Sequence, residues 1–437
     1  MPFSFDLAVI FHRERRRTKS RPKVTGRRRR EICKSHEALE EIPFDLVVEI
    51  LMKSLMRFKS VSKLWSSFIR SQYFTNRFLK VPSSSVPRLY LWLEFEDSHR
   101  GNVLLSSSAS TDSDGTRMSS FIVDQEVTIA AMKGYSFSHV YRGLMCFKKG
   151  PSAHIYNTTT RQLVVLPDID ESNIIAEDHK HKKILYHIGH DPVHDRYKVL
   201  CTVARTSNEV GDDITFLSEQ WVLLLRGDGP SRWRKIPCPS PPHFPLTQGL
   251  AINGRMHYLA WVHVGDPVLV SFDISSEDMS ILQVPEDDSF WPHRFNRLIE
   301  FGGRVALLDH SNVKSEGVMK LWVMEDAEKN NRWWSKTFVL QPSEMHIVST
   351  HMVDNTSLRV HGTTRNGEVI LVPQNVTHTR TGGRIYNPQN STLFYVFLYD
   401  LQKNHIRKVE IKETSNRYLT RDWNVLGVDD VDNLMYL

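Results

Sequence analysis

Apolar residues between positions 42 and 78 recur at the three- and four-residue spacing of an amphipathic helix. A first run places Leu46, Val47, Ile50 and Leu51 on one helical face. A second run makes a similar face from Leu55, Phe58, Val61, Leu64, Trp65, Phe68 and Ile69. Pro43 suits the first turn of a helix, because the N–H that it lacks would have no helical partner there. We therefore expect two or three short helices whose apolar faces need a core or a partner helix to cover them.

The pattern changes after residues 81–87, whose sequence VPSSSVP is typical of a linker. Short strand-like runs replace the helical spacing, at 89–95, 120–123 and 143–147. Residues 106–119 are rich in Ser, Asp and Thr, and we expect a loop there. The second part of the chain is therefore predicted to be rich in β-strands.

Two kinds of unit recur beyond residue 130. One is a glycine followed by a short apolar run, and it begins at Gly143, Gly254, Gly303 and Gly367. The other is a strand, a turn that contains Asn or Asp, and a second strand, at 155–167, 271–285 and 398–409, with looser versions at 221–237 and 321–340. Asn and Asp stabilise such turns by accepting hydrogen bonds from nearby backbone N–H groups, so we interpret these units as hairpins. The units at Gly254 and Gly303 start 49 residues apart. The unit at Gly367 starts 64 residues after the one at Gly303. A period near 50 with four strands per unit favours kelch-like propeller blades over a sandwich.

The same segments carry a family resemblance. The helical part resembles an F-box motif through IP at 42–43, VEIL at 48–51, KSL at 53–55 and RFKSVSKLW at 57–65. The β-rich part resembles the F-box associated domain through GLMCF, IYNTTTRQLVVLP, IGHDPVHDRYKVLC and SFDISSEDMSILQVP. The chain thus looks most like plant-type F-box proteins with an F-box associated interaction domain. In that family the box is a helical hook that binds a Skp-type adaptor and so joins a cullin-based SCF ubiquitin ligase.

The resemblance implies which residues meet the adaptor. They are Ile42, Pro43, Leu46, Ile50, Leu55, Phe58, Val61 and Trp65. The sequence departs from the family at Met52, because the family usually has a few more residues there, including a Leu-Pro dipeptide. Two functions therefore stay open. One is a substrate-recognition subunit of an SCF ligase, which binds an unidentified protein substrate through its β domain. The alternative is a non-enzymatic β-propeller scaffold with a degenerate F-box.

These patterns predict an α+β fold in separate domains. A disordered basic tail at 1–35 precedes an F-box-like helical domain at 36–80, a linker at 81–87 and a large all-β, propeller-like domain at 88–437. A length of 437 residues exceeds one ordinary domain, and 40% hydrophobic with 24% charged residues is typical of a globular protein. No run of about 18 apolar residues occurs, so we expect no transmembrane helix and no membrane partner.

Positive charge is concentrated in residues 13–30, which hold eleven Arg or Lys and one Glu and so carry +10. The whole chain carries +6, which leaves −4 for everything else (6 − 10 = −4). Four consecutive arginines, Arg27, Arg28, Arg29 and Arg30, suggest a nuclear localisation signal, and we expect a nuclear or cytoplasmic protein. The segment could instead contact nucleic acid through phosphates or have no role. No basic and aromatic stripe elsewhere extends it, so nucleic acid is the less favoured partner.

The sequence offers little evidence of catalytic chemistry. The segment HIGHDPVHD brings together His187, His190, Asp191, His194 and Asp195, which are ligand types that zinc accepts. Asp191 and Pro192 initiate a turn, so we interpret the segment as a strand, a turn and a strand. The cysteines Cys33, Cys146, Cys201 and Cys238 are far apart and are expected to be reduced and mostly buried. No nucleophile elbow, phosphate-binding loop or dinucleotide fingerprint occurs, and we expect no enzyme activity, no cofactor and no metal.

Overall fold

The structure is a computed structural model, and its description covers thirteen stretches of the chain. They are residues 88–93, 102–111, 118–176, 182–206, 214–225, 232–237, 241–285, 296–325, 332–352, 356–364, 367–375, 394–412 and 423–429. All of them belong to one unit, Ser54–Leu437.

The glycine-led units form tight hairpin turns at equivalent places. Gly143, Gly254, Gly303 and Gly367 have φ angles of 73°, 75°, 74° and 80°. Glycine is the residue that adopts this left-handed conformation without steric cost. Each glycine leads directly into a strand, namely β5 (Leu144–Lys149), β14 (Arg255–His263), β18 (Arg304–Asp309) and β22 (Glu368–Asn375). The recurring unit that the sequence suggested is therefore the start of the second strand of a blade.

The units with Asn or Asp form a second repeated turn. Asn157, Asp273 and Asp400 each accept hydrogen bonds at Oδ1 from the backbone N–H groups two and three residues further on, at 2.9–3.1 Å. These turns join β6 (Ser152–Asn157) to β7 (Leu163–Val165), β15 (Asp266–Asp273) to β16 (Met279–Gln283), and β23 (Phe394–Asp400) to β24 (His405–Lys412). The predicted hairpins are confirmed, and they connect the third and fourth strands of their blades.

The described strands make six antiparallel blades. Blade 1 is β25 (Trp423–Asp429), β1 (Arg88–Leu93), β2 (Asn102–Thr111) and β3 (Met118–Ile129), and blade 2 is β4 (Ser136–Tyr141) with β5, β6 and β7. Blade 3 is β8 (Lys182–Asp191), β9 (Arg196–Thr206), β10 (Phe216–Leu225) and β11 (Arg234–Ile236). In blade 4, β12 (Phe244–Pro245) and β13 (Leu250–Ile252) both pair with β14, which is followed by β15 and β16. Blade 5 is β17 (Asn296–Phe301), β18, β19 (Val318–Met324) and β20 (Trp333–Val339), and blade 6 is β21 (Thr356–Thr363) with β22, β23 and β24.

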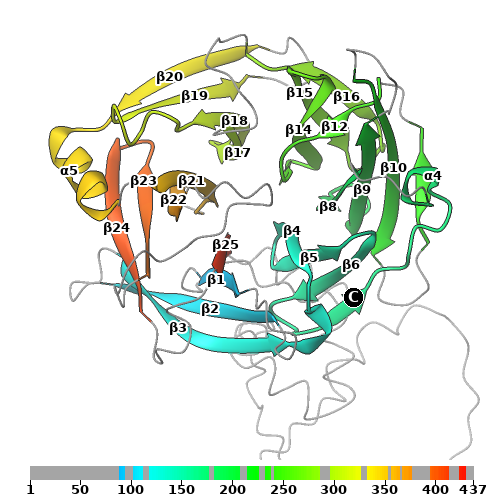
Figure 1. Ribbon diagram of the computed structural model, residues 1–437, viewed down its shortest axis with the longest axis horizontal. Helices are drawn as coiled ribbons and strands as arrows, with labels where there is room; N and C mark the ends of the chain where they lie inside the picture. Colours follow the sequence, from blue (N-terminus) through cyan, green and yellow to red (C-terminus); the bar gives the residue numbers. More distant parts are fainter. Residues whose placement is uncertain are drawn as a thin grey trace, which may run out of the picture. The chain divides into compact units, whose positions relative to one another are not determined.

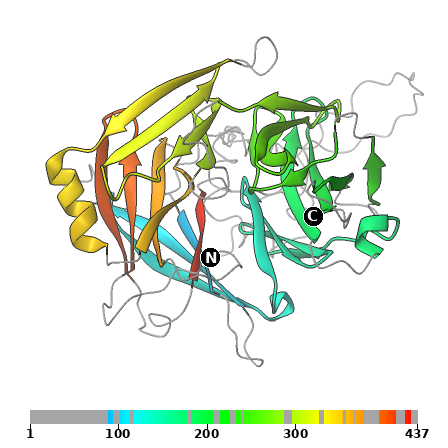
Figure 2. The ribbon, with the colours of Figure 1, turned by 45° about the horizontal axis from the view of Figure 1, so that its top comes forward.

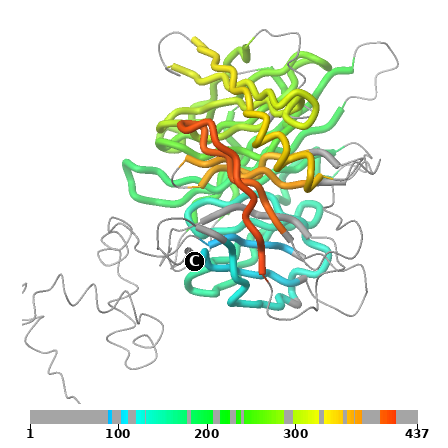
Figure 3. The backbone as a smooth tube through the Cα atoms, turned by 90° about the vertical axis from the view of Figure 1, so that its left-hand side faces the viewer, coloured from blue at the N-terminus to red at the C-terminus, as the bar shows by residue number. Residues whose placement is uncertain are grey.

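The innermost strands of the blades close a ring. Each contacts the next in the cycle β4, β8, β13, β17, β21, β25 and back to β4, and Figure 1 shows the blades around this circuit. The last strand, β25, pairs with the first, β1, so that Asp429 lies opposite Arg88. Blades 6 and 1 also share an edge, because β24 pairs in parallel with β3 over three residues of each strand. Figure 3 shows the orange-red strands of blade 6 crossing in front of the cyan strands of blade 1.

Hydrophobic packing follows the same cycle, since one buried cluster fills each of the six junctions between neighbouring blades. Alternate residues of one strand serve two junctions. In β5, Met145 and Phe147 pack toward blade 1, whereas Leu144 and Cys146 pack toward blade 3. Strands buried on both faces have continuous rather than alternating apolar sequences. The predicted propeller-like β fold is therefore confirmed for the described residues.

One predicted loop is wrong at both of its ends. Residues 106–119 were expected to be irregular, but β2 continues to Thr111 and β3 begins at Met118, while residues 112–117 lie outside the described residues. The serines are accommodated because they bond within the sheet: Ser107 Oγ donates to the carbonyl of Leu89 at 2.9 Å and is fully buried. Tertiary pairing here overrides a polar composition.

The irregular spacing of the glycine units also has a structural cause. The longer interval before Gly367 contains the helix α5 (Pro342–His351), which lies between β20 and β21 and packs outside β24 (Figure 2). A capping box begins this helix, in which the side chains of Gln341 and Glu344 each accept a backbone N–H of the other residue. The other described α-helix, α4 (Asn173–Ala176), is one turn long, and neither could span a bilayer.

Candidate functional site

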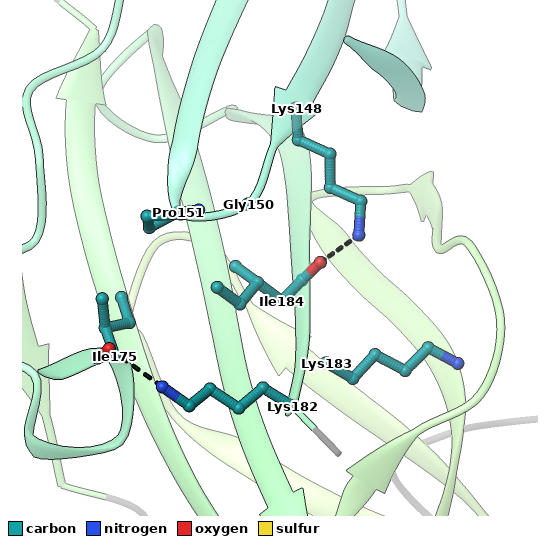
Figure 4. A pocket seen from close by; sticks show the side chains of 7 residues that line it. All are labelled: Lys148, Gly150, Pro151, Ile175, Lys182, Lys183 and Ile184. Atoms are coloured by element: carbon teal, nitrogen blue, oxygen red, sulfur yellow. Dashed lines mark hydrogen bonds between the residues drawn. The ribbon is translucent and has the colours of Figure 1, made fainter. Parts of the chain in front are cut away.

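A cavity of about 290 Å³ lies where blades 2 and 3 meet (Figure 4). It is lined by Lys148, Gly150, Pro151, Ile175, Lys182, Lys183 and Ile184. The tight turn between β5 and β6 forms one wall, and Gly150 allows that turn with a φ of 58°. Helix α4 and the first residues of β8 form the others. Three separate elements therefore bring three lysines and a partly apolar wall to one place.

Strand geometry decides where the lysines point. Lys182 and Lys183 are consecutive in β8, and successive side chains of a strand point to opposite faces. Figure 4 shows Lys182 directed toward α4 and Lys183 directed to the other side of β8, where Lys148 also lies. Lys148 and Lys183 thus form a pair on one side of the strand, with Lys182 at the opposite side.

All three ammonium groups donate hydrogen bonds to backbone carbonyls. Lys148 Nζ donates to the carbonyl of Ile184, and Lys182 Nζ donates to that of Ile175 at 3.0 Å. Lys183 Nζ donates to the carbonyl of Leu246 at 3.0 Å and lies 5.6 Å from the centre of the Phe244 ring. No lining residue is acidic. The positive charges are therefore met by dipoles and a ring face, without a carboxylate among the described residues.

The electrostatic consequence appears in the pKa values. Burial lowers the pKa of Lys148 below its ordinary value. Burial, and then the charge of Lys148, lower the pKa of Lys183 to about 8. Both shifts follow from holding an ammonium group away from water without a counter-charge. An anion placed between Lys148 and Lys183 would raise both pKa values again.

A second cavity, of about 290 Å³ between blades 3 and 4, shows the opposite arrangement. There Lys198 Nζ lies 3.4 Å from Asp191 Oδ2 and 3.0 Å from Glu277 Oε1, and Arg234 also pairs with Glu277. Burial opposes ionisation of Asp191, but hydrogen bonds from Ser275 and His194 lower its pKa. Lys198 and Arg234 are thus already paired with carboxylates.

A third cavity, of about 370 Å³, lies at the inner strands and is lined by Tyr141, Arg142, Asn253 and Glu300 among others. Beside it, His139 Nε2 donates to the carbonyl of Gly249 at 3.1 Å and its Nδ1 accepts the N–H of Ile188. These two bonds require the neutral ring. Burial accordingly lowers the pKa of His139 to about 4.

The residues that the sequence singled out fall into two groups. The eight adaptor-contact residues, Ile42, Pro43, Leu46, Ile50, Leu55, Phe58, Val61 and Trp65, lie outside the described residues, as do Arg27, Arg28, Arg29 and Arg30. They stay predictions.

The histidine-rich segment is described, and it is the predicted strand, turn and strand of β8 and β9. His190 Nε2 lies 2.8 Å from Asp195 Oδ1, and His194 Nδ1 lies 2.8 Å from Asp191 Oδ2. The carboxylates of the turn therefore hold these two rings. Across the described residues, no three side chains of the types that bind metals are grouped together.

Sequence reasoning missed the lysine cavity. Its only sequence signal is a pair of lysines at one end of each of two strands, 148–149 after LMCF and 182–183 before ILY. The two pairs are 34 positions apart (182 − 148), and only the packing of blade 2 against blade 3 brings Lys148 to Ile184.

Comparisons with known proteins agree with the fold. Residues 90–432 match the F-box associated beta propeller domain family. An F-box/kelch-repeat protein of Arabidopsis thaliana is 62% identical over 444 residues, which cover 100% of both chains. An F-box protein of the same organism is 59% identical, again over 100% of both chains. An Arabidopsis thaliana F-box/LRR-repeat protein is 39% identical over 91% of this chain and 88% of that protein.

Proposed function

This chain belongs to the family of plant F-box proteins with an F-box associated β-propeller domain, and on that premise we propose that it is the substrate-recognition subunit of an SCF ubiquitin ligase. The observation that carries the proposal is the full-length match to a relative named as an F-box protein, because that match includes residues 36–80 as well as the propeller. The relatives' names suggest a non-enzymatic adaptor.

The mechanism is positioning. The predicted helical segment would hold a Skp-type adaptor, and through it a cullin, while the propeller holds a protein substrate. Bringing the substrate to the conjugating enzyme raises its effective concentration there, and the covalent chemistry takes place on other subunits. A closed ring with six packed junctions suits this role, since a rigid scaffold keeps the bound substrate at a defined distance.

A second function is favoured by one observation. Leu51 is followed by Met52 and then directly by Lys53, where the family usually has a longer connection with a Leu-Pro dipeptide. A continuous helix there would change the angle between the two apolar runs. The alternative is a propeller scaffold whose box no longer binds an adaptor.

Location in the cell is a further part of the proposal. Arg27, Arg28, Arg29 and Arg30 would act as a nuclear import signal, giving a protein of the nucleus, the cytoplasm or both. A fluorescent fusion of the full chain, compared with one in which these four arginines are alanine, measures this directly.

Direct binding of the full chain to a purified Skp-type adaptor tests the proposal. A second version of the chain carries a Leu-Pro-containing turn inserted after Met52. Micromolar or tighter binding by the native chain supports the ligase subunit. Binding by the inserted version alone supports the scaffold, and binding by neither refutes the adaptor role.

A further inference from the structure

The lysine cavity between blades 2 and 3 holds three lysines, and no carboxylate is among the described residues that line it. Lys148, Lys182 and Lys183 are each partly buried, and each ammonium group donates to one backbone carbonyl. An ammonium group has three N–H donors. Two donors of each lysine thus remain for water or a ligand, as far as the described residues go.

Other lysines of this propeller are paired with carboxylates. Lys198, Lys235 and Lys403 each lie within 3.1 Å of a Glu or Asp oxygen. Lys148 and Lys183 have no such partner in the described part of the chain, although both are more buried than Lys403, whose side chain is 79% exposed. Partly buried cations without a counter-charge destabilise a fold unless something else meets them.

We propose that this cavity binds an acidic segment of the substrate protein, with a side-chain carboxylate seated between Lys148 and Lys183. The inference rests on the proposed function and names the chemistry of the substrate. A carboxylate accepts charge-assisted hydrogen bonds from two ammonium groups at once. It also supplies a counter-charge, which none of the described lining residues provides.

The shape and the wall favour a peptide over a small free anion. A cavity of about 290 Å³ is at the lower limit for a whole ligand and suits one side chain of a longer one. Ile175, Ile184 and Pro151 line it beside the lysines, and Pro151 is exposed. These apolar groups can contact the methylene carbons of a glutamate, which inorganic phosphate does not offer. Lys182, on the other side of β8, can receive a second acidic residue of the same segment.

The experiment measures binding of a short fluorescent peptide of alternating glutamate and glycine to the full chain. The same peptide with glutamine in place of glutamate is the first control, and inorganic phosphate is tested as a competitor. Lys148→Met and Lys183→Met keep the aliphatic part of each side chain and remove its charge. Lys149→Met is the matched variant, because Lys149 is the next residue of β5 and is exposed.

We expect the glutamate peptide to bind, the glutamine peptide to bind about tenfold more weakly or not at all, and each of Lys148→Met and Lys183→Met to weaken binding about tenfold. Lys149→Met should leave it unchanged. Equal binding of both peptides, an equal loss with Lys149→Met, or no binding at all overturns the inference. Full displacement by inorganic phosphate at concentrations that match the peptide shows a small-anion site and overturns it as well.

Adaptor binding by the same preparations separates this inference from the proposed function. A thermal unfolding curve for each variant shows whether its propeller is folded. A chain that binds the adaptor but ignores the glutamate peptide refutes only the acidic-substrate site. A chain that binds the peptide but no adaptor refutes the ligase subunit and leaves an acidic-peptide scaffold.

Discussion

The ammonium group of Lys183 donates a hydrogen bond to the backbone carbonyl of Leu246 at 3.0 Å. Lys183 belongs to the first strand of blade 3, and Leu246 follows β12 in blade 4. The bond therefore crosses a junction between blades, as does that from Lys148 of blade 2 to Ile184 of blade 3. One pair of lysines both joins three blades and presents a positive charge that no carboxylate of the described residues pairs with.

The first prediction concerns Lys183→Met. The pKa of Lys183 is lowered to about 8 in the folded protein from an ordinary value of 10.5, so the folded state binds fewer protons than the unfolded state between these values. The wild-type protein therefore gains stability as the pH rises from about 8 to about 10.5, and the variant lacks this gain. Urea unfolding at several pH values should show the variant losing stability relative to the wild type between pH 7 and pH 10. A difference that does not change with pH would contradict the lowered pKa.

The second prediction concerns the loss of folding stability at acid pH. Burial lowers the pKa values of His139 and His243 to about 4 from 6.5, so the unfolded state binds more protons between these values. Stability is then lost as the pH falls from about 6.5 toward 4, by up to about 3 kcal/mol for each ring. His243→Gln removes one titrating ring and leaves a polar group near the hydroxyl of Tyr258, which lies 2.7 Å from His243 Nε2. Its unfolding free energy should fall less steeply with pH than that of the wild type, and parallel slopes would refute the assignment.

The third prediction concerns the turn at Asp400. Its Oδ1 accepts two backbone N–H groups, at 2.9 and 3.0 Å, from Gln402 and Lys403. Asp400→Ala should lower the unfolding free energy by about 1–3 kcal/mol, because both donors lose their acceptor. Asp400→Asn keeps an acceptor oxygen and is the control. Equal losses for the two variants in urea unfolding would show that the charge, rather than the turn, matters.

The fourth prediction concerns ring closure. Removing residues 423–437 deletes β25, the inner strand of blade 1, and leaves the paired edge of β1 uncovered. We expect a large drop in the thermal unfolding midpoint and loss of a single cooperative transition, since unpaired buried backbone groups are costly. Removing only 430–437 leaves β25 in place and is the control. Similar melting curves for the two truncations would mean that β25 does not close the ring.

The fifth prediction concerns the adaptor contact. Leu55→Ala and Trp65→Ala should each weaken adaptor binding by about 2–4 kcal/mol, which is tenfold or more in affinity. Lys59→Ala, a change off the apolar face, is the matched control. Calorimetric titration of the full-length variants checks this. Losses below tenfold for both apolar variants would remove Leu55 and Trp65 from the interface.

Local turn chemistry made much of the fold predictable. A glycine such as Gly254 or an acceptor side chain such as Asp273 determines a hairpin from within a few residues, so the sequence pattern predicts those hairpins well. The Ser-rich run was misread because Ser107 bonds to Leu89, which lies 18 positions away, and no local pattern records that pairing.

Neither the number of blades nor the lysine cavity could be predicted from the sequence, for the same reason. The ring closes through β25 and β1, the last and first described strands, which are more than 300 residues apart, and α5 lengthens one repeat. The cavity needs Lys148 and Lys183 from two blades to approach the same junction. Such relationships depend on packing between distant segments, whereas periodicity reports only neighbours along the chain.

The central claim is tested most directly by co-assembly. The purified full chain is mixed with a Skp-type adaptor and a cullin, and the masses of the species are measured by size-exclusion chromatography with light scattering. The account predicts one stable complex that contains all three proteins, and loss of this chain from it when Trp65 is changed to Ala. A full chain that elutes alone, while its circular dichroism shows a folded propeller, would contradict the ligase subunit.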